Sequence, residues 1–275
     1  MKTVPLVLLA VIYYCGASTT SAQTWTQTSA TNNVWSSITC SADGTKLFAC
    51  AGGGSPFTGS PSPIYASTDR GATWSPTGSS SNYWASIASS ADGIKLVAVV
   101  GTSSQTGGIY TSTDGGLNWT SNNITAKQWR SVTSSADGSK LFAVTFFGQF
   151  YSSTDSGTTW NSNAAPNGAT SIACSADGTK LVAAPGNVGG YLCTSTNSGV
   201  TWVTNNSMSG RLWWSVASSA NGKVLAAVDG HGGPGSHVIT STNFGTIWAT
   251  NNVPLSWSWQ NIAVSADGTT LIAAA

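Results

Sequence analysis

The sequence predicts an all-β protein, a β-propeller made of four-stranded blades. Two short motifs alternate strictly along the 275 residues, and successive copies of each lie 40 to 49 residues apart. The stretches between them are typical of short strands, and none shows the 3.6-residue periodicity of a helix. Repeats of this length with four strands each are typical of propeller blades rather than of a sandwich.

The first motif, Ser-Ala-Asp-Gly with Asn for Asp in one copy, predicts the turn between the two inner strands of each blade. In the second repeat, residues 84–89 precede this turn and residues 95–100 follow it, and both runs are typical of strands. The six copies begin at Ser41, Ser90, Ser135, Ser175, Ser219 and Ser265.

A tryptophan stands six residues before this motif in five repeats and therefore begins the innermost strand. If exposed, these rings would surround the mouth of the central channel and offer flat faces to sugars. At a repeated position, however, burial between blades is the favoured interpretation. The five residues are Trp35, Trp84, Trp129, Trp213 and Trp259.

The second motif, Ser-Thr-Asp-x-Gly-x-x-Trp with Asn for Asp in two copies, predicts the turn from the third to the fourth strand. We expect its Asp or Asn to cap backbone amides of the turn and its glycine to adopt a positive φ. Because Asn serves in two copies, the charge is not required, which argues against a catalytic or metal role. These structural residues are Asp69, Asp114, Asp155, Asn197 and Asn243.

This second motif resembles the Asp-box, or BNR, repeat of sialidase-like propellers. The match begins with residues 67–74, Ser-Thr-Asp-Arg-Gly-Ala-Thr-Trp, and covers roughly residues 24–275 through five copies. The resemblance implies a propeller fold. In sialidases of this fold it also implies an arginine cluster, a Tyr/Glu nucleophile pair and an aspartic acid, whereas this chain has three scattered arginines and no glutamate.

The ends of the chain bear on the number of blades. Trp25 matches the fourth strand of a blade, while residues 258–275 hold only two inner strands. We therefore expect six blades, the last incomplete and without a third strand, or seven if the chain is a fragment. Self-association through the incomplete blade is then one way of completing it.

Residues 1–22 are typical of a signal peptide, with Lys2, a short apolar run and small residues before Gln23. Residues 23–275 then form a single propeller domain. The apolar run is too short to span a bilayer, so we expect a secreted or cell-surface protein without a membrane span. Pairing of Cys40, Cys50, Cys174 and Cys193 cannot be deduced, and burial as small hydrophobes is an equal alternative.

Composition narrows the function classes. Ten Lys and Arg residues against nine acids leave no basic surface for nucleic acid. A glycoside hydrolase needs two carboxylates across the scissile bond. Eight of the nine Asp residues lie in the repeated turns, which leaves Asp229 alone. We therefore expect no enzymatic activity and no cofactor, with a degenerate sialidase-like glycoside hydrolase as the alternative.

The loops that differ between repeats are the candidate binding face. Trp214 and Trp257 lie outside the repeat, with Arg130 and Arg211 nearby, and these four residues are the candidate ligand contacts. Residues 228–237 hold the non-repeat acid and both histidines, so Asp229, His231 and His237 form an alternative metal site, against the interpretation of a simple glycine-rich loop.

These observations together predict a secreted or cell-surface binding or scaffold module. Its expected partner is a glycan or an extracellular protein. A structural subunit of an extracellular assembly is a further alternative.

Overall fold

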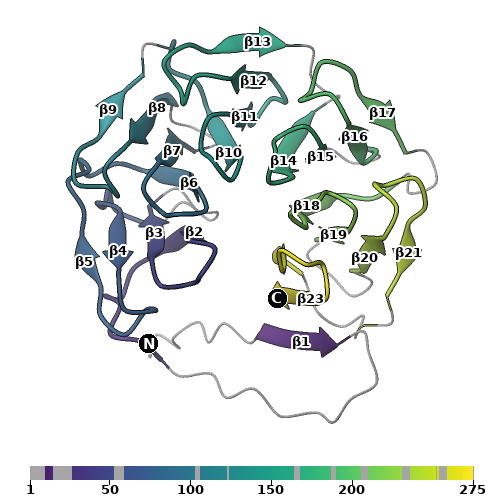
Figure 1. Cartoon of the computed structure of the whole chain (residues 1–275), viewed down its shortest axis with the longest axis horizontal. Helices are drawn as coiled ribbons and strands as arrows, with labels where there is room; N and C mark the ends of the chain where they lie inside the picture. Colours follow the sequence, from purple (N-terminus) through teal and green to yellow (C-terminus); the bar gives the residue numbers. More distant parts are fainter. Residues whose placement is uncertain are drawn as a thin grey trace.

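The chain folds into a ring of β-sheets around a central channel (Figure 1). The computed structural model describes residues 10–14, 27–52, 59–102, 106–122, 124–163, 168–186, 190–205, 210–230, 236–251, 253 and 259–274. Every regular element in these ranges is a strand, and none of them contains a helix able to cross a membrane. The predicted all-β propeller is confirmed.

Five complete blades follow one another in chain order, each a four-stranded antiparallel sheet with its first strand innermost. Blade one consists of β2 (Trp35–Cys40), β3 (Leu47–Ala51), β4 (Tyr65–Ser67) and β5 (Ser75–Pro76). Blade two consists of β6 (Trp84–Ser89), β7 (Leu96–Gly101), β8 (Thr106–Ser112) and β9 (Thr120–Ser121). Blade three consists of β10 (Trp129–Ser134), β11 (Leu141–Thr145), β12 (Phe150–Ser153) and β13 (Asn161–Asn163).

Blades four and five repeat this pattern. Blade four consists of β14 (Ala169–Cys174), β15 (Leu181–Pro185), β16 (Cys193–Ser195) and β17 (Val203–Thr204). Blade five consists of β18 (Trp213–Ser218), β19 (Leu225–Asp229), β20 (Val238–Ser241) and β21 (Ala249–Thr250).

The sixth sheet, called sheet six below, has three strands: β22 (Asn261–Val264), β23 (Thr270–Ala274) and β1 (Ala10–Tyr14). The expectation that the third strand would be missing was wrong, because β1 pairs antiparallel with β23 and places Ala10 opposite Ala274. β1 falls inside the predicted signal peptide 1–22. The rest of that segment, and Trp25, lie outside the described residues.

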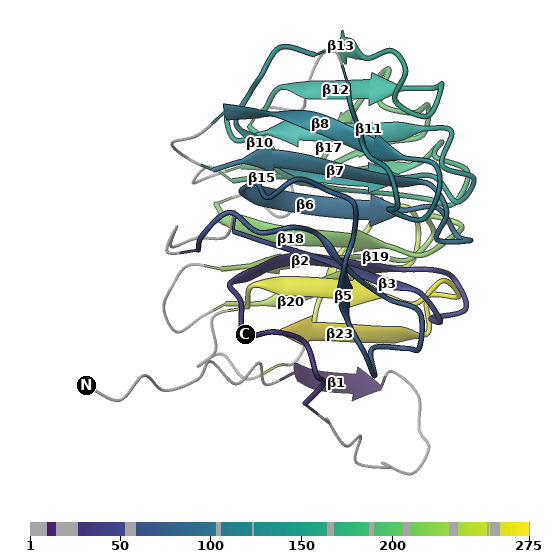
Figure 2. The ribbon, with the colours of Figure 1, turned by 90° about the vertical axis from the view of Figure 1, so that its left-hand side faces the viewer.

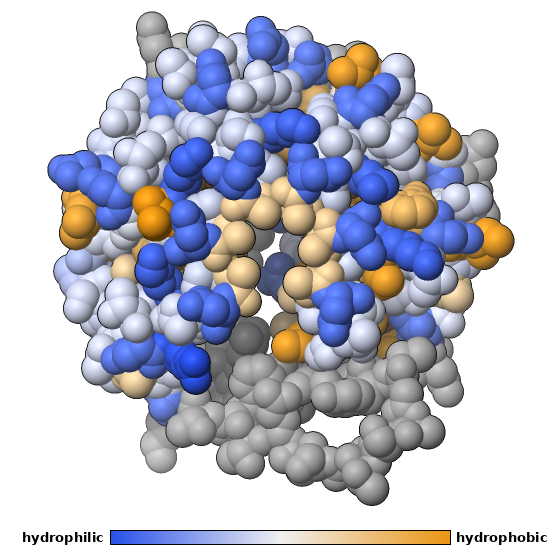
Figure 3. Space-filling view, viewed as in Figure 1, coloured by the Kyte–Doolittle hydropathy of each residue, from blue (hydrophilic) through white to orange (hydrophobic). Residues whose placement is uncertain are grey.

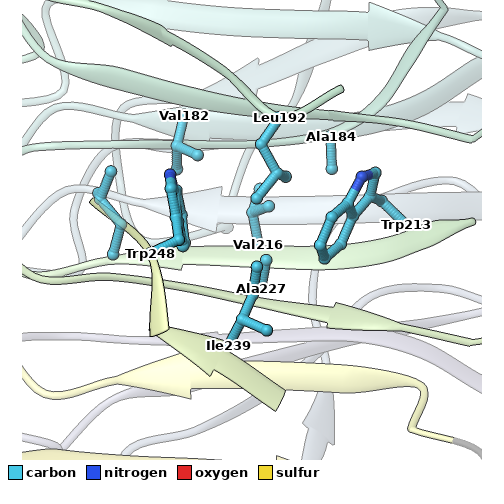
Figure 4. Packing of buried hydrophobic residues seen from close by; sticks show 9 residues of the cluster. Val182, Ala184, Leu192, Trp213, Val216, Ala227, Ile239 and Trp248 are labelled. Carbon is cyan, nitrogen blue, oxygen red and sulfur yellow. The ribbon is translucent and has the colours of Figure 1, made fainter. Parts of the chain in front are cut away.

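The hydrophobic core of the described residues is divided into five clusters, each between two neighbouring sheets. Figure 4 shows the cluster in which Val182 and Leu192 of blade four pack against Trp213, Val216 and Trp248 of blade five. Burying this apolar surface joins the blades, and all five residues are at most 6% exposed. The other four clusters join blades one and two, two and three, three and four, and blade five with sheet six.

Seen from the side, the inner strands cross the disc, so that their two ends open on opposite faces (Figure 2). One face carries the turns of both repeated motifs and is called the turn face. The opposite end of each innermost strand, where the repeated tryptophan stands, opens at the channel mouth. Figure 3 shows a mostly hydrophilic surface, with hydrophobic colour limited to a rim around the channel and a few single residues.

Candidate ligand-binding site at the channel mouth

All six innermost strands contribute to a cavity of about 290 Å³ at the start of the channel. Each provides the residue after the repeated tryptophan position and the residue after that. The first set differs between blades: Ser36, Ala85, Arg130, Thr170, Trp214 and Gln260. The second set is nearly uniform: Ser37, Ser86, Ser131, Ser171, Ser215 and Asn261.

The uniform serines connect the blades. The Ser86 hydroxyl accepts a hydrogen bond from the Val132 amide of the next blade at 3.2 Å, and Ser171 accepts one from Val216 at 3.2 Å. The same bond recurs at the other three described blade junctions. These hydroxyls are engaged in holding the ring together, so differences in chemistry reside in the first set.

Arg130 and Trp214, both predicted ligand contacts, come together here from blades three and five. The Arg130 guanidinium lies 5.7 Å from the centre of the Trp214 ring and 6.0 Å from that of Phe146. Burial lowers the pKa of Arg130 from its ordinary value, because desolvation disfavours the charged form. Among the described residues no carboxylate forms an ion pair with Arg130.

Two neighbouring phenylalanines extend this aromatic surface. Phe146 and Phe147 follow β11 directly, and their ring centres lie 5.6 Å apart in an edge-to-face arrangement. Phe147 is 75% exposed. An exposed aromatic pair beside a partly buried cation is suited to stacking against a flat apolar face of a ligand while the cation meets an anionic group.

Arg211, the third predicted ligand contact, has a different role from the one expected. Its Nη1 atom lies 2.5 Å from Asp229 Oδ2, and Asp229 is buried. The same nitrogen lies 2.6 Å from Nδ1 of His237. Arg211 is therefore committed to an internal ion pair rather than offered to a ligand.

The same cluster bears on the alternative metal site. Asp229 and His237 do come together, with Oδ2 and Nδ1 3.1 Å apart, but the Arg211 cation occupies the carboxylate. Within the described ranges no three His, Cys, Asp or Glu side chains form a group able to hold a metal ion. His231 lies outside those ranges, as does Trp257, the fourth predicted ligand contact.

The tryptophan ring is packing rather than a binding surface in four of its five members. Trp84, Trp129, Trp213 and Trp259 are buried between blades. Their indole groups fill the clusters described above, and Trp213 donates from Nε1 to the Gly190 carbonyl at 3.1 Å. The exception is Trp35, which is 37% exposed.

In all five copies of the second motif, called the Asp box below, the Asp or Asn side chain accepts a hydrogen bond from a backbone amide four residues on. In the box of blade two, Asp114 Oδ1 accepts from the Asn118 amide at 2.9 Å, and Asn197 makes the same bond to Thr201 in blade four. The motif glycines have positive φ, 89° at Gly116. Sequence reasoning missed the serine of the box: Ser112 is buried and accepts from the Gly116 amide at 2.9 Å.

The carboxylates leave little room for acid–base chemistry at the mouth. None of the described residues that line the cavity is acidic, and the chain has no glutamate. Each Asp of the repeated motifs bonds within its own turn, and hydrogen bonds lower the pKa of Asp69 and Asp155 to about 2. The four described cysteines, Cys40, Cys50, Cys174 and Cys193, are free thiols.

The comparisons with known proteins establish the fold alone. No protein-family model matches the chain, and no curated protein matches it. The GH74 enzyme of Niastella koreensis is similar in structure, with a TM-score of 0.66 at 16% identity over 87% of this chain and 44% of that one. YCF48 from Cyanidioschyzon merolae has a TM-score of 0.55 at 13% identity, covering 88% and 95%. A chain of a nidogen–laminin complex has a TM-score of 0.62 at 14% identity, covering 84% of each.

These similar structures include both glycoside hydrolases and proteins solved with a partner. The chain spans less than half the length of the GH74 enzyme. All identities are far below the level at which function can be carried over, so the β-propeller is the common finding.

Proposed function

We propose that this chain is a non-enzymatic, secreted or cell-surface binding module whose ligand is an acidic glycan held at the channel mouth. The observation that carries the proposal is the position of Arg130. It is a partly buried cation without an acidic partner among the described residues, it lies over the rings of both Phe146 and Trp214, and it lines a cavity that also carries hydroxyls.

The chemistry of the lining selects the class of ligand. A desolvated guanidinium binds a carboxylate or sulfate through charge-assisted hydrogen bonds. The aromatic faces suit the apolar face of a sugar ring, and Thr170 on β14 offers a hydroxyl in the same cavity. A uronic acid or a sulfated sugar combines these three features in one residue.

The same geometry argues against the glycoside hydrolase alternative. Hydrolysis needs an acid and a second carboxylate on either side of the bond. Asp229 is the one acid outside the repeated turns, and it is buried against Arg211 and His237 rather than among the cavity residues. Incubation with chromogenic glycosides should therefore release no product above the uncatalysed rate.

A glycan array followed by titration calorimetry tests the proposal. We expect binding to oligosaccharides that contain uronic acid or sulfate and none to their neutral counterparts. Arg130→Gln and Trp214→Ala should each weaken binding by about tenfold or more, since a charged hydrogen bond contributes about 1.5–3 kcal/mol and a stacked ring about 1–3 kcal/mol by analogy with bases. Arg70→Gln, which removes a charge from the turn face, is the matched control.

Other results would redirect the assignment. Equal binding of neutral and acidic glycans would show that Arg130 is not the anchor. Binding of peptides through a free terminal carboxylate, lost in Arg130→Gln, would make a protein the ligand of the same cavity. Glycoside hydrolysis that disappears in Asp229→Asn would make the chain an enzyme.

A further inference from the structure

Blade one has an uncovered face where every later blade has a buried one. Ile38 in β2 is 63% exposed, whereas Ile87 at the same position in β6 is 4% exposed. The corresponding residues of the later sheets are all buried: Val132, Ile172, Val216 and Ile262. In each of those cases the preceding sheet covers the side chain.

The neighbours of Ile38 share this exposure. Trp35 is the one exposed member of the tryptophan ring, and Val34 beside it is also exposed. Cys40 is exposed as well, while Cys174 at the same position in blade four lies with Sγ 3.2 Å from the Ser134 carbonyl of the preceding blade. We call this uncovered face, formed by Val34, Trp35, Ile38 and Cys40, the seam.

The hydrogen bonds between blades stop at the same place. In the turns of the first motif, called the a–b turns because they join the first and second strands of each sheet, each alanine amide donates to the alanine carbonyl of the next sheet, from Ala42 to Ala91 at 2.7 Å and onwards to Ala266. The serine bonds of the cavity run in parallel, from Ser37 to Ser215. Among the described residues neither series joins sheet six to blade one, and in Figure 1 no labelled strand lies between β23 and β2.

The outer rim of this opening is nevertheless filled by the chain itself. The segment that follows β5, the outermost strand of blade one, packs against the Asp box of blade two. Its Thr77 lies close to Gly116, with Cγ2 3.2 Å from the position that a Cβ on this glycine would occupy. Thr28 lies against Gly71 of blade one in the same manner, at 3.9 Å, and Ser29 donates to the Ala72 carbonyl at 2.7 Å. The chain thus supplies the outer contact of a blade that would precede blade one.

We propose that the seam is a docking surface for a separate polypeptide that contributes a three-stranded antiparallel β-sheet of this same repeat type. Its second strand presents alternating β-branched side chains to Trp35 and Ile38. Its innermost strand places a hydroxyl where it accepts from the Ile38 amide, and its turn donates an amide to the Ala42 carbonyl. This proposal does not rest on the ligand at the channel mouth.

The occupant is identified by the surface it must match. The five described junctions between sheets share one pattern of apolar side chains and backbone hydrogen bonds. The seam has the groups that the later sheet contributes to each of these junctions. A free helix or a lone strand would leave either the apolar face or the hydrogen-bonding groups unmatched. The sheet that covers blade three, residues 84–112, already has the required form.

The test uses the full chain and a fluorescent synthetic peptide of residues 84–112. We expect saturable binding by fluorescence anisotropy, weakened about tenfold or more in Ile38→Lys, because the lysine would bury a charge in an apolar contact, and retained in Ile38→Val. In a Cys15→Ser background, maleimide labelling of Cys40 should slow as the peptide binds, while Cys50, at 0% exposed, should stay unlabelled throughout.

Thermal melting separates docking from folding. Ile38→Lys should leave the melting temperature unchanged, since the side chain is already in water, whereas the matched Ile87→Lys should lower it sharply. An equal loss in both variants would show that Ile38 is core and would overturn the proposal. So would peptide binding that is indifferent to Ile38→Lys, undiminished labelling of Cys40 at saturation, or a dimer of this chain that Ile38→Lys dissociates, which would assign the seam to a second copy.

Discussion

The turn face and the channel mouth are opposite ends of the same strands, yet the mouth combines a repeated serine ring with a second ring of side chains that differs between blades. Every turn of the first motif has a serine, such as Ser90, that accepts a hydrogen bond from the amide five residues on, and in the five complete blades this serine is buried. At the mouth the corresponding ring reads Ser, Ala, Arg, Thr, Trp and Gln. Uniformity marks the groups on which the ring depends, and variation marks the place where a ligand can be selected.

The sharpest test of this difference lies within one dipeptide of β18. Trp213 is fully buried between blades four and five, while Trp214 lines the cavity. Trp213→Ala should lower the free energy of unfolding by about 3–5 kcal/mol, the usual loss for a buried tryptophan. Trp214→Ala should change it far less. Chemical denaturation followed by fluorescence measures both.

The partial packing of Trp214 makes this comparison informative. Trp214 also contacts Gly230, whose built Cβ would lie 3.4 Å from its Cβ and Cγ. A loss in Trp214→Ala as large as that in Trp213→Ala would show that both rings are core, and the mouth would lose its main aromatic contact.

A smaller effect is expected from the buried hydroxyl of an Asp box. Ser112→Ala leaves the Gly116 amide without its partner, which should destabilise the chain by about 1–3 kcal/mol. Asp114→Asn should be milder, because Asn197 and Asn243 already accept the same backbone bond. Neither change should alter ligand binding at the mouth. A greater loss in Asp114→Asn than in Ser112→Ala would restore the charge as the essential feature of the box.

Much of the fold could be predicted from the sequence because the repeat carries it. Residues 84–89 were expected as an innermost strand and form β6, and each Asp-box glycine takes the positive φ that its turn requires. β1 could not be foreseen, since Ala10–Tyr14 contains neither motif and its partner β23 lies at the other end of the chain. Two strands so far apart in the sequence can pair without any short-range sequence motif that would predict it.

The candidate site was predicted in part. Arg130 and Trp214 were selected and do meet, but Phe146 follows a repeated strand and carried no signal of its own. The partner of Arg211 was hidden for a similar reason, because Asp229 and His237 come close only when β19 and β20 pair. The sequence does contain a better signal for the site. The residue after each repeated tryptophan position lines the cavity, and its identity changes from blade to blade.

The smallest expected effect is a loss of stability in acid that arises from the Asp residues of the turn face. Hydrogen bonds from the turn hydroxyls and amides lower the pKa of Asp43, Asp155 and Asp267 from its ordinary value of 3.8 to about 2. A carboxylate whose pKa is lower in the folded chain stabilises it above the unfolded pKa and loses this contribution as pH falls through the folded value. The melting temperature should therefore hold from pH 7 to about 4 and decline toward about 2.

A matched variant shows where this acid sensitivity arises. Replacing Asp69, Asp114 and Asp155 together by Asn converts these boxes to the form found at Asn197 and Asn243, whose side chains do not titrate in this range. The decline below pH 4 should become shallower, because only the a–b turns still lose charge. A decline as steep as that of the parent would place the acid sensitivity outside the Asp boxes, in the turns of the first motif.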